Sequence, residues 1–190
     1  GAQAGRQVAF GQDGRIRVVD VTTRRVRDLT PAMQAGPASA PAWSPDGRRV
    51  AFMVGSDRQR GGGGLWLVPA DGQGPPQRLL DGDVRDPAWS PDGTTIAYTS
   101  ASSTERGLWV VDTDDGQRRR LTTEAGCFLS SGAPAWAPDG MSIAVGIETS
   151  APGGISCGLW LVDPRDPSKP RTLIGDGRGS HAAWRPGPRG

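Results

Sequence analysis

Two kinds of short apolar run alternate along the chain. The first kind ends in a large residue: "RRVAF" at Phe52, "TTIAY" at Tyr98 and "MSIAV" at Val145. The second contains tryptophan: "GLWLV" from Gly64 and Gly158, and "GLWVV" from Gly107. Short apolar runs bounded by Gly, Pro and Asp are typical of β-strands, and imperfect alternation is expected where a sheet is covered on both faces. The pattern therefore predicts an all-β protein.

These runs belong to a repeat whose first strand also carries tryptophan. The stretch "PAWSPDG" begins at Pro41 and Pro87, "PAWAPDG" begins at Pro134, and a worn copy, "AAWRPG", begins at Ala182. Their tryptophans, Trp43, Trp89, Trp136 and Trp184, are spaced 46, 47 and 48 residues apart. A period of about 40 to 50 residues with several short strands in each unit is typical of a β-propeller blade.

Each unit is interpreted as four strands, a to d. Strand a is the "AW" segment, strands b and c are the two apolar runs, and strand d is "QRLL", "RRLT" or "RTLI". Ser-Pro-Asp-Gly joins a to b, because proline presets φ, aspartate accepts backbone hydrogen bonds and glycine takes a positive φ. Asp46, Asp92 and Asp139 are therefore predicted to be turn residues rather than metal ligands.

The two ends of the chain complement each other. The first unit starts at strand b, "RQVAF", and "HAAWRPG" near the end supplies only a strand a. We predict a single domain over 1–190, a small β-propeller with four blades of four antiparallel strands. In this interpretation the C-terminal strand completes the N-terminal blade and closes the ring, which removes a free sheet edge. The predicted blades are 7–30 plus 181–187, 40–81, 86–123 and 133–175. Two chains exchanging ends would instead form an eight-bladed ring, so the sequence leaves a monomer and a swapped dimer open.

The segments "PAWSPDGRRVAF…LWLV" and "PAWSPDGTTIAY…LWVVD" resemble the WD40-like (PD40) repeat of TolB-type β-propellers. The resemblance covers about Gln7 to Pro186 and implies a propeller fold. It also implies a place among cell-envelope proteins, propellers attached to peptidases, or extracytoplasmic sensor domains. Fold-level resemblance alone does not assign a function.

The two cysteines lie in loops that emerge on one face of the predicted ring. Cys127 is in a d–a loop and Cys157 is in the b–c loop of the next blade. We predict a Cys127–Cys157 disulfide, which implies an oxidising compartment: periplasm, cell surface or secretion. A Gly-, Arg- and Ala-rich composition with one lysine, Lys169, suggests a bacterial source. An extracytoplasmic, bacterial location is thus expected.

The remaining motifs argue against catalysis. "GISCG" at 154–158 matches Gly-x-Ser-x-Gly, but Ser156 leads into a strand rather than a helix, and His181 is the only histidine. No cofactor motif or metal-ligand cluster is found, so no cofactor, no metal site and no enzyme activity are expected. The net charge of +2 argues against a nucleic-acid partner. No apolar run reaches about 18 residues, so no membrane insertion is expected.

Recognition is expected on the d–a/b–c loop face, where loop lengths vary: 56–64, 122–133 and 148–158. Positions three and four residues before each strand-a tryptophan are predicted to surround the channel mouth. Their polar members, Ser39, Arg85, Asp86, Ser180 and His181, are the candidate site. The sequence favours a non-catalytic extracytoplasmic binding or sensor propeller that recognises a protein, peptide or small molecule. The alternatives are an accessory propeller of a larger enzyme, such as a peptidase, and a TolB-like cell-envelope assembly protein.

Overall fold

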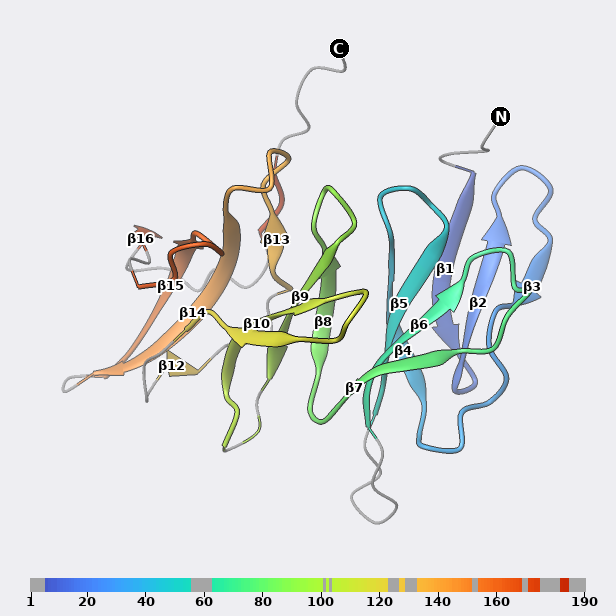
Figure 1. Ribbon diagram of the computed structural model, residues 1–190, viewed down its shortest axis with the longest axis horizontal. Coiled ribbons are helices and arrows are strands. Elements are labelled where there is room, and N and C mark those ends of the chain that lie inside the picture. Colours follow the sequence, from blue (N-terminus) through green and yellow to red (C-terminus); the bar gives the residue numbers. More distant parts are fainter. Residues whose placement is uncertain are drawn as a thin grey trace. The chain divides into compact units, whose positions relative to one another are not determined.

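The computed structural model confirms an all-β architecture. It describes residues 6–55, 63–100, 102, 104–122, 127–128, 133–151, 154–168, 171–174 and 182–184, and none of these lies in a helix. Antiparallel strands account for all of the regular structure in this part of the chain (Figure 1). The chain divides into two compact units, Gly1–Pro87 and Ala88–Gly190, and the single domain and its blade boundaries remain predictions.

The first unit contains two sheets. One has three strands in the order β1-β2-β3, namely β1 (Gln7–Gln12), β2 (Arg15–Asp20) and β3 (Val26–Asp28). The other has four strands in the order β4-β5-β6-β7, namely β4 (Ala38–Trp43), β5 (Arg49–Val54), β6 (Gly64–Pro69) and β7 (Gln77–Asp81). The second sheet matches the a-b-c-d order predicted for a blade.

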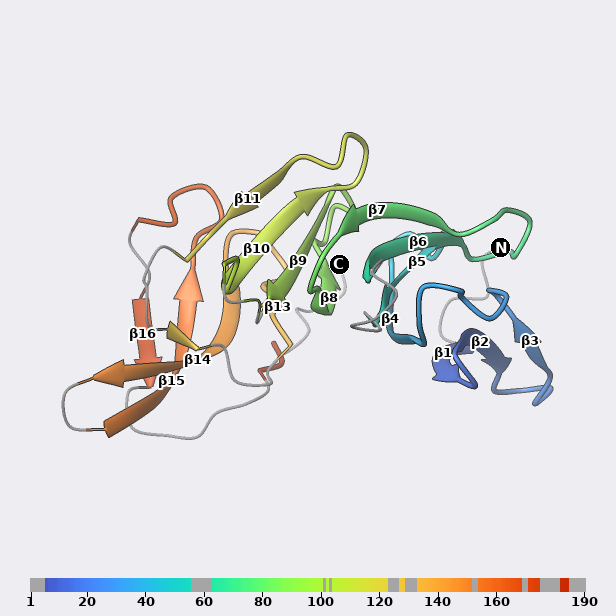
Figure 2. The ribbon, with the colours of Figure 1, turned by 90° about the horizontal axis from the view of Figure 1, so that it is seen from below.

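The second unit contains two more sheets. One has the order β11-β10-β9-β8, with β8 (Arg85–Trp89) beginning at the end of the first unit and followed by β9 (Thr95–Ser100), β10 (Gly107–Asp112) and β11 (Arg118–Arg120). Figure 2 shows these four strands side by side. The other sheet has the order β12-β14-β15-β16, and β13 also pairs with β14. Its strands are β12 (Cys127–Phe128), β13 (Ala135–Trp136), β14 (Ile143–Ala151), β15 (Gly154–Val162) and β16 (Arg171–Ile174).

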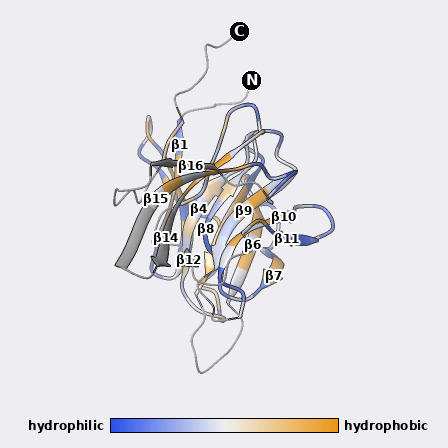
Figure 3. Cartoon of the chain, turned by 90° about the vertical axis from the view of Figure 1, so that its left-hand side faces the viewer, coloured by the Kyte–Doolittle hydropathy of each residue, from blue (hydrophilic) through white to orange (hydrophobic). Residues whose placement is uncertain are grey.

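Strands b and c supply the core because their apolar runs are buried on both faces. In the first unit Val50, Phe52 and Val68 are fully buried against Ile16 and Val18 of the three-stranded sheet. In the second unit a corresponding cluster joins Leu108 and Val110 to Ile143, Val145 and Val162. Figure 3 shows the same division, with apolar residues on the strands and polar residues in the turns between them. This sheet-on-sheet burial is the main stabilising contribution to each unit.

The two Ser-Pro-Asp-Gly turns and the related Ala-Pro-Asp-Gly turn have the predicted backbone. Gly47, Gly93 and Gly140 have φ of 69°, 73° and 71°. Asp46 Oδ1 accepts hydrogen bonds from Ser44 Oγ at 2.6 Å and from the backbone N–H of Arg48 at 3.0 Å. These donors lower the pKa of Asp46, the Ser44 hydroxyl being the largest cause. The aspartates therefore hold turns, as expected.

The side-chain pair that joins strands c and d differs between the first sheet and two of the others. On β6 and β10, Trp66 and Trp109 lie beneath arginine guanidinium groups of the adjacent strand d, with Arg78 at 5.8 Å and Arg118 at 5.1 Å from the ring centroids. At the same position of β2 stands Arg17, which pairs with Asp28 on β3 at 2.8 Å. A tryptophan–arginine contact is thus replaced by an arginine–aspartate ion pair, which keeps strands c and d joined.

The predicted closure of the first blade is not present in the described residues. There, β1 pairs with β2 alone, and residues 182–184 belong to no strand. Trp184 instead donates from its indole N–H to the carbonyl of Ala135 at 2.9 Å. Trp136 makes the same contact with Ala88 at 3.1 Å, so Trp184 is placed like the strand-a tryptophan of a following repeat. The number of blades in a closed ring remains a prediction.

Candidate functional site

The residue three positions before the strand-a tryptophan has an unusual backbone in two repeats. Ala40 and Asp86 have φ of 47° and 51°, in the left-handed region that residues with a Cβ seldom occupy. Each precedes a proline, Pro41 or Pro87, which has no N–H to donate to a neighbouring strand. In β4 the pairing register with β5 shifts at this point, between Ser39 and Ala42. Strained residues of this kind are often found at functional positions.

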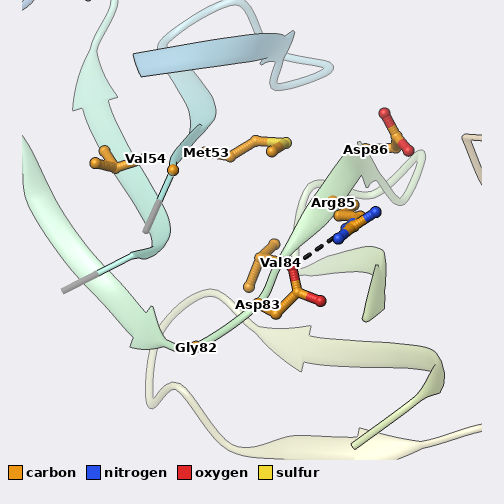
Figure 4. A pocket seen from close by; sticks show the side chains of 8 residues that line it. Met53, Val54, Gly82, Asp83, Val84, Arg85 and Asp86 are labelled. Atoms are coloured by element: carbon orange, nitrogen blue, oxygen red, sulfur yellow. Dashed lines mark hydrogen bonds and ion pairs between the residues drawn. The ribbon is translucent and has the colours of Figure 1, made fainter. Parts of the chain in front are cut away.

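A pocket of about 380 Å³ lies beside Asp86 in the first unit. Its lining comes from the end of β5 and from the segment that joins β7 to β8: Met53, Val54, Gly55, Gly82, Asp83, Val84, Arg85 and Asp86 (Figure 4). These are the start of a b–c connection and a d–a connection, so both loop types meet here as predicted. The volume is within the range of small-ligand sites, about 300 to 1,000 Å³.

The charged groups of this pocket come from three residues that flank Val84: Asp83, Arg85 and Asp86. Arg85 Nε donates to Asp83 Oδ1 at 3.2 Å, and the two side chains are 55% and 32% exposed. Figure 4 shows the Arg85 guanidinium turned toward Asp83 and the Asp86 carboxylate turned away from both. The wall thus combines apolar side chains, Met53, Val54 and Val84, with one cation and two carboxylates at the rim. Such a lining suits a ligand with an apolar group and a polar or charged end.

The other predicted site residues fall into two groups. Ser39 lies next to the pocket, because its backbone pairs with that of Met53 in the β4–β5 register. Ser180 and His181 lie outside the described residues, so their place at the site stays a prediction. Sequence reasoning missed Met53, Val54 and Gly82–Val84. The predicted strand b ends at Phe52, so Met53 and Val54 lie outside it, and in the connection between strands d and a only Arg85 and Asp86 are predicted site residues.

One predicted recognition loop is wrong. Residues 148–158 were expected to form a b–c loop, yet β14 and β15 stay paired from Ile143↔Val162 to Ala151↔Gly154. Ile147, Thr149 and Ile155 are β-branched residues, which favour extended backbone and outweigh the nearby Pro152 and glycines. Ser156 therefore lies within β15, opposite Thr149, and the Gly-x-Ser-x-Gly match has no strand–turn–helix elbow around it.

The same register bears on the predicted disulfide. Cys127 pairs with Thr149 across one edge of β14, and Cys157 pairs with Glu148 across the other edge. One strand therefore separates the two cysteines, which corresponds to a Cα–Cα distance of about 9 to 10 Å. A disulfide needs Cα atoms within about 7 Å. The backbone arrangement thus argues against a Cys127–Cys157 bond, and the compartment inferred from that bond loses this support.

Within the described ranges, no group of three or more His, Cys, Asp or Glu side chains is placed to hold a metal ion. The same part of the chain has no helix of sufficient length and apolar character to cross a membrane. The arrangement at the pocket is suited to binding through apolar contacts, hydrogen bonds and charge.

The repeat geometry matches a known family. The model of the TolB β-propeller domain matches residues 5–151, and the chain therefore belongs to the TolB β-propeller family. A search of curated proteins finds no match.

Solved structures agree on the fold. A TolB-like protein from Agrobacterium tumefaciens superposes with a TM-score of 0.72 at 21% identity, covering 95% of this chain and 66% of that one. An oligogalacturonate lyase solved with manganese gives 0.71 at 17% identity, covering 93% and 52%. A puromycin-hydrolysing peptidase of Mycobacterium tuberculosis gives 0.69 at 19% identity, covering 92% and 28%. The chain thus spans between about two thirds and a quarter of these proteins, whose likeness shows the fold alone.

Proposed function

We propose that this chain is a non-catalytic binding propeller that recognises a peptide, protein or small molecule at the d–a/b–c loop face. The observation that supports this most directly is the pocket beside Asp86, where left-handed backbone, an exposed Arg85–Asp83 pair and apolar side chains meet. A rigid sheet positions these loop residues, as is common for recognition sites. Ser39 lies on the adjacent strand, and Ser180 and His181 are proposed to extend the site.

The ligand class follows from the lining. Met53, Val54 and Val84 would bury a short apolar side chain, while Arg85 would bind a carboxylate and Asp86 a donor or cation. A peptide offers both kinds of group. An extracytoplasmic, bacterial location is part of the proposal and is supported by family membership.

The test selects peptides from a displayed library on the immobilised full chain and measures their affinities in solution. Arg85→Gln is expected to weaken the selected peptides about tenfold or more, because it removes a charge-assisted bond. Arg78→Gln is the matched control: Arg78 is a similarly exposed arginine of the same unit, is paired with Asp81, and lies outside the pocket. Asp86→Asn is the second variant. If the selected peptides bind both Arg85→Gln and Asp86→Asn as tightly as they bind the unmodified chain, the proposed site is wrong.

A second candidate, an accessory propeller of a larger enzyme, is favoured by the likeness to the puromycin-hydrolysing peptidase. In that case the pocket would select substrates for a hydrolase domain elsewhere in the protein. Its test is the cleavage rate of the selected peptides by the complete protein, with and without Arg85→Gln. A KM that rises while kcat stays unchanged would support the accessory role.

A further inference from the structure

Asp86 differs from the other two charged residues of the pocket in having no partner. Arg85 Nε donates to Asp83 Oδ1 at 3.2 Å, so these two charges offset each other. The Asp86 carboxylate makes no hydrogen bond or ion pair with any described residue, and it is turned away from the Arg85 guanidinium (Figure 4). Asp86 is also only partly exposed, so water solvates its charge less fully than on an open surface. The pocket therefore carries one negative charge that no described side chain pairs with.

The backbone at Asp86 belongs to the repeat, whereas the carboxylate does not. Ala40 stands at the same position of the preceding repeat, before Pro41, and its φ of 47° is close to the 51° of Asp86. Since an alanine adopts this conformation too, the carboxylate is not needed to form it. Asp46 in the a–b turn accepts hydrogen bonds that hold its turn, but Asp86 accepts none from a described residue. The carboxylate is thus available to a ligand.

The apolar wall limits what that ligand can be. Met53, Val54 and Val84 line the pocket, and Val84 is 5% exposed. The volume of about 380 Å³ lies near the lower end of the range for small-ligand sites, about 300 to 1,000 Å³. A compact ammonium group on a short apolar chain matches both features. Its chain would contact the apolar wall, and its N–H groups would form charge-assisted hydrogen bonds with a carboxylate.

We propose that Asp86 selects a protonated primary amine on an apolar chain. Two sources share this chemistry: the amino terminus of a peptide that begins with an apolar residue, and a lysine side chain. The inference rests on the proposed function and names the group that the pocket recognises, while Arg85 remains the partner for a carboxylate. Asp86 is then a specificity-determining residue, because an acetylated amine would leave its partly buried charge without a partner.

The test is equilibrium dialysis of three synthetic tetrapeptide libraries against the full chain, with mass spectrometry as the readout. All three have a free carboxyl terminus and no arginine. The first has a free amino terminus and no lysine, the second is N-acetylated with one lysine, and the third is N-acetylated without lysine. The third is expected to bind about tenfold more weakly than the better of the other two, because it has no amine. Which of those two binds better identifies the source of the amine.

Asp86→Asn should abolish this preference for an amine. Asp86→Ala should do the same and keep the backbone, because Ala40 has the same conformation. Asp13→Ala is the matched control: Asp13 lies in the same unit, has a φ of 52°, is 70% exposed and lies outside the pocket, so the preference should remain.

Two outcomes overturn the inference and leave the proposed function standing. One is equal binding of all three libraries to the unmodified chain. The other is a preference for the amine that survives both substitutions of Asp86. If no library binds at all, the proposed function and this inference are both wrong.

Discussion

At the residue scale, the three repeated turns differ in one hydroxyl group. Ser44 and Ser90 donate to Asp46 and Asp92 at 2.6 and 2.5 Å, whereas the third turn has Ala137 at this place. The third turn has the same backbone bonds, with Gly140 N–H donating to the Ala137 carbonyl at 2.9 Å and Met141 N–H to Asp139 at 2.8 Å. The chain therefore contains its own comparison of a turn with and without the serine.

Ala137→Ser is expected to raise the free energy of unfolding by about 0.5–1.5 kcal/mol, because it adds a serine–aspartate hydrogen bond to a preformed turn. Ser90→Ala should lower it by a similar amount. Both are measured by urea unfolding. In an Asp139→Ala background, which removes the acceptor, the gain from Ala137→Ser should shrink, and an undiminished gain there would contradict the serine–aspartate hydrogen bond as its cause.

The pH dependence follows from the same bond. Ser90 holds the pKa of Asp92 below its ordinary value of 3.8. A carboxyl whose pKa is lower in the folded state stabilises the fold above its unfolded pKa, and this contribution is lost as the pH falls through the folded pKa. The destabilisation caused by Ser90→Ala should therefore be largest near neutral pH and should narrow below about pH 4. An equal effect at both pH values would contradict this account.

At the element scale, the length of the β14–β15 hairpin determines where the cysteines lie. Each strand has nine residues, and the pairing continues to Ala151↔Gly154, so Cys127 and Cys157 flank β14 on opposite sides. We expect two free thiols per chain when non-reduced protein is unfolded and titrated with a thiol reagent. The Cys127→Ser chain should contain one titratable thiol, and its melting temperature should be the same with and without reductant. A titration that finds no free thiol in the unmodified chain would instead support the Cys127–Cys157 disulfide.

The same element shows which parts of the fold the sequence could predict. Strands b and c were identifiable because their apolar runs are buried on both faces. The turn between strands a and b was identifiable because its proline, aspartate and glycine each favour the turn conformation. The 148–158 segment was misjudged because Pro152 and two glycines signal a loop, while the β-branched residues around them pair across the hairpin. Arg85 and Asp86 were identifiable from their place in the repeat. The apolar pocket wall at Met53 and Val54 was not, because it depends on how β5 ends beside the β7–β8 connection.

At the scale of the whole molecule, adjacent repeats are coupled through the strand-a tryptophans. Trp136 donates across to Ala88 of the preceding repeat, and Trp184 donates to Ala135. Repeat proteins derive much of their stability from such nearest-neighbour contacts. Trp43 has the side chain of this series without its acceptor. The coupling between repeats can therefore be measured by comparing Trp→Phe at Trp136, which has the acceptor, with Trp→Phe at Trp43, which has none.

Trp→Phe removes the same ring volume and the same N–H at Trp43 and at Trp136, so packing losses largely cancel in the comparison. Trp136→Phe also leaves the Ala88 carbonyl without its donor, and we expect it to cost about 1–3 kcal/mol more than Trp43→Phe. Both are measured by urea unfolding of the full chain. If Trp43→Phe proves as costly as Trp136→Phe, the hydrogen bond from Trp136 to the Ala88 carbonyl makes no measurable contribution to the coupling between repeats.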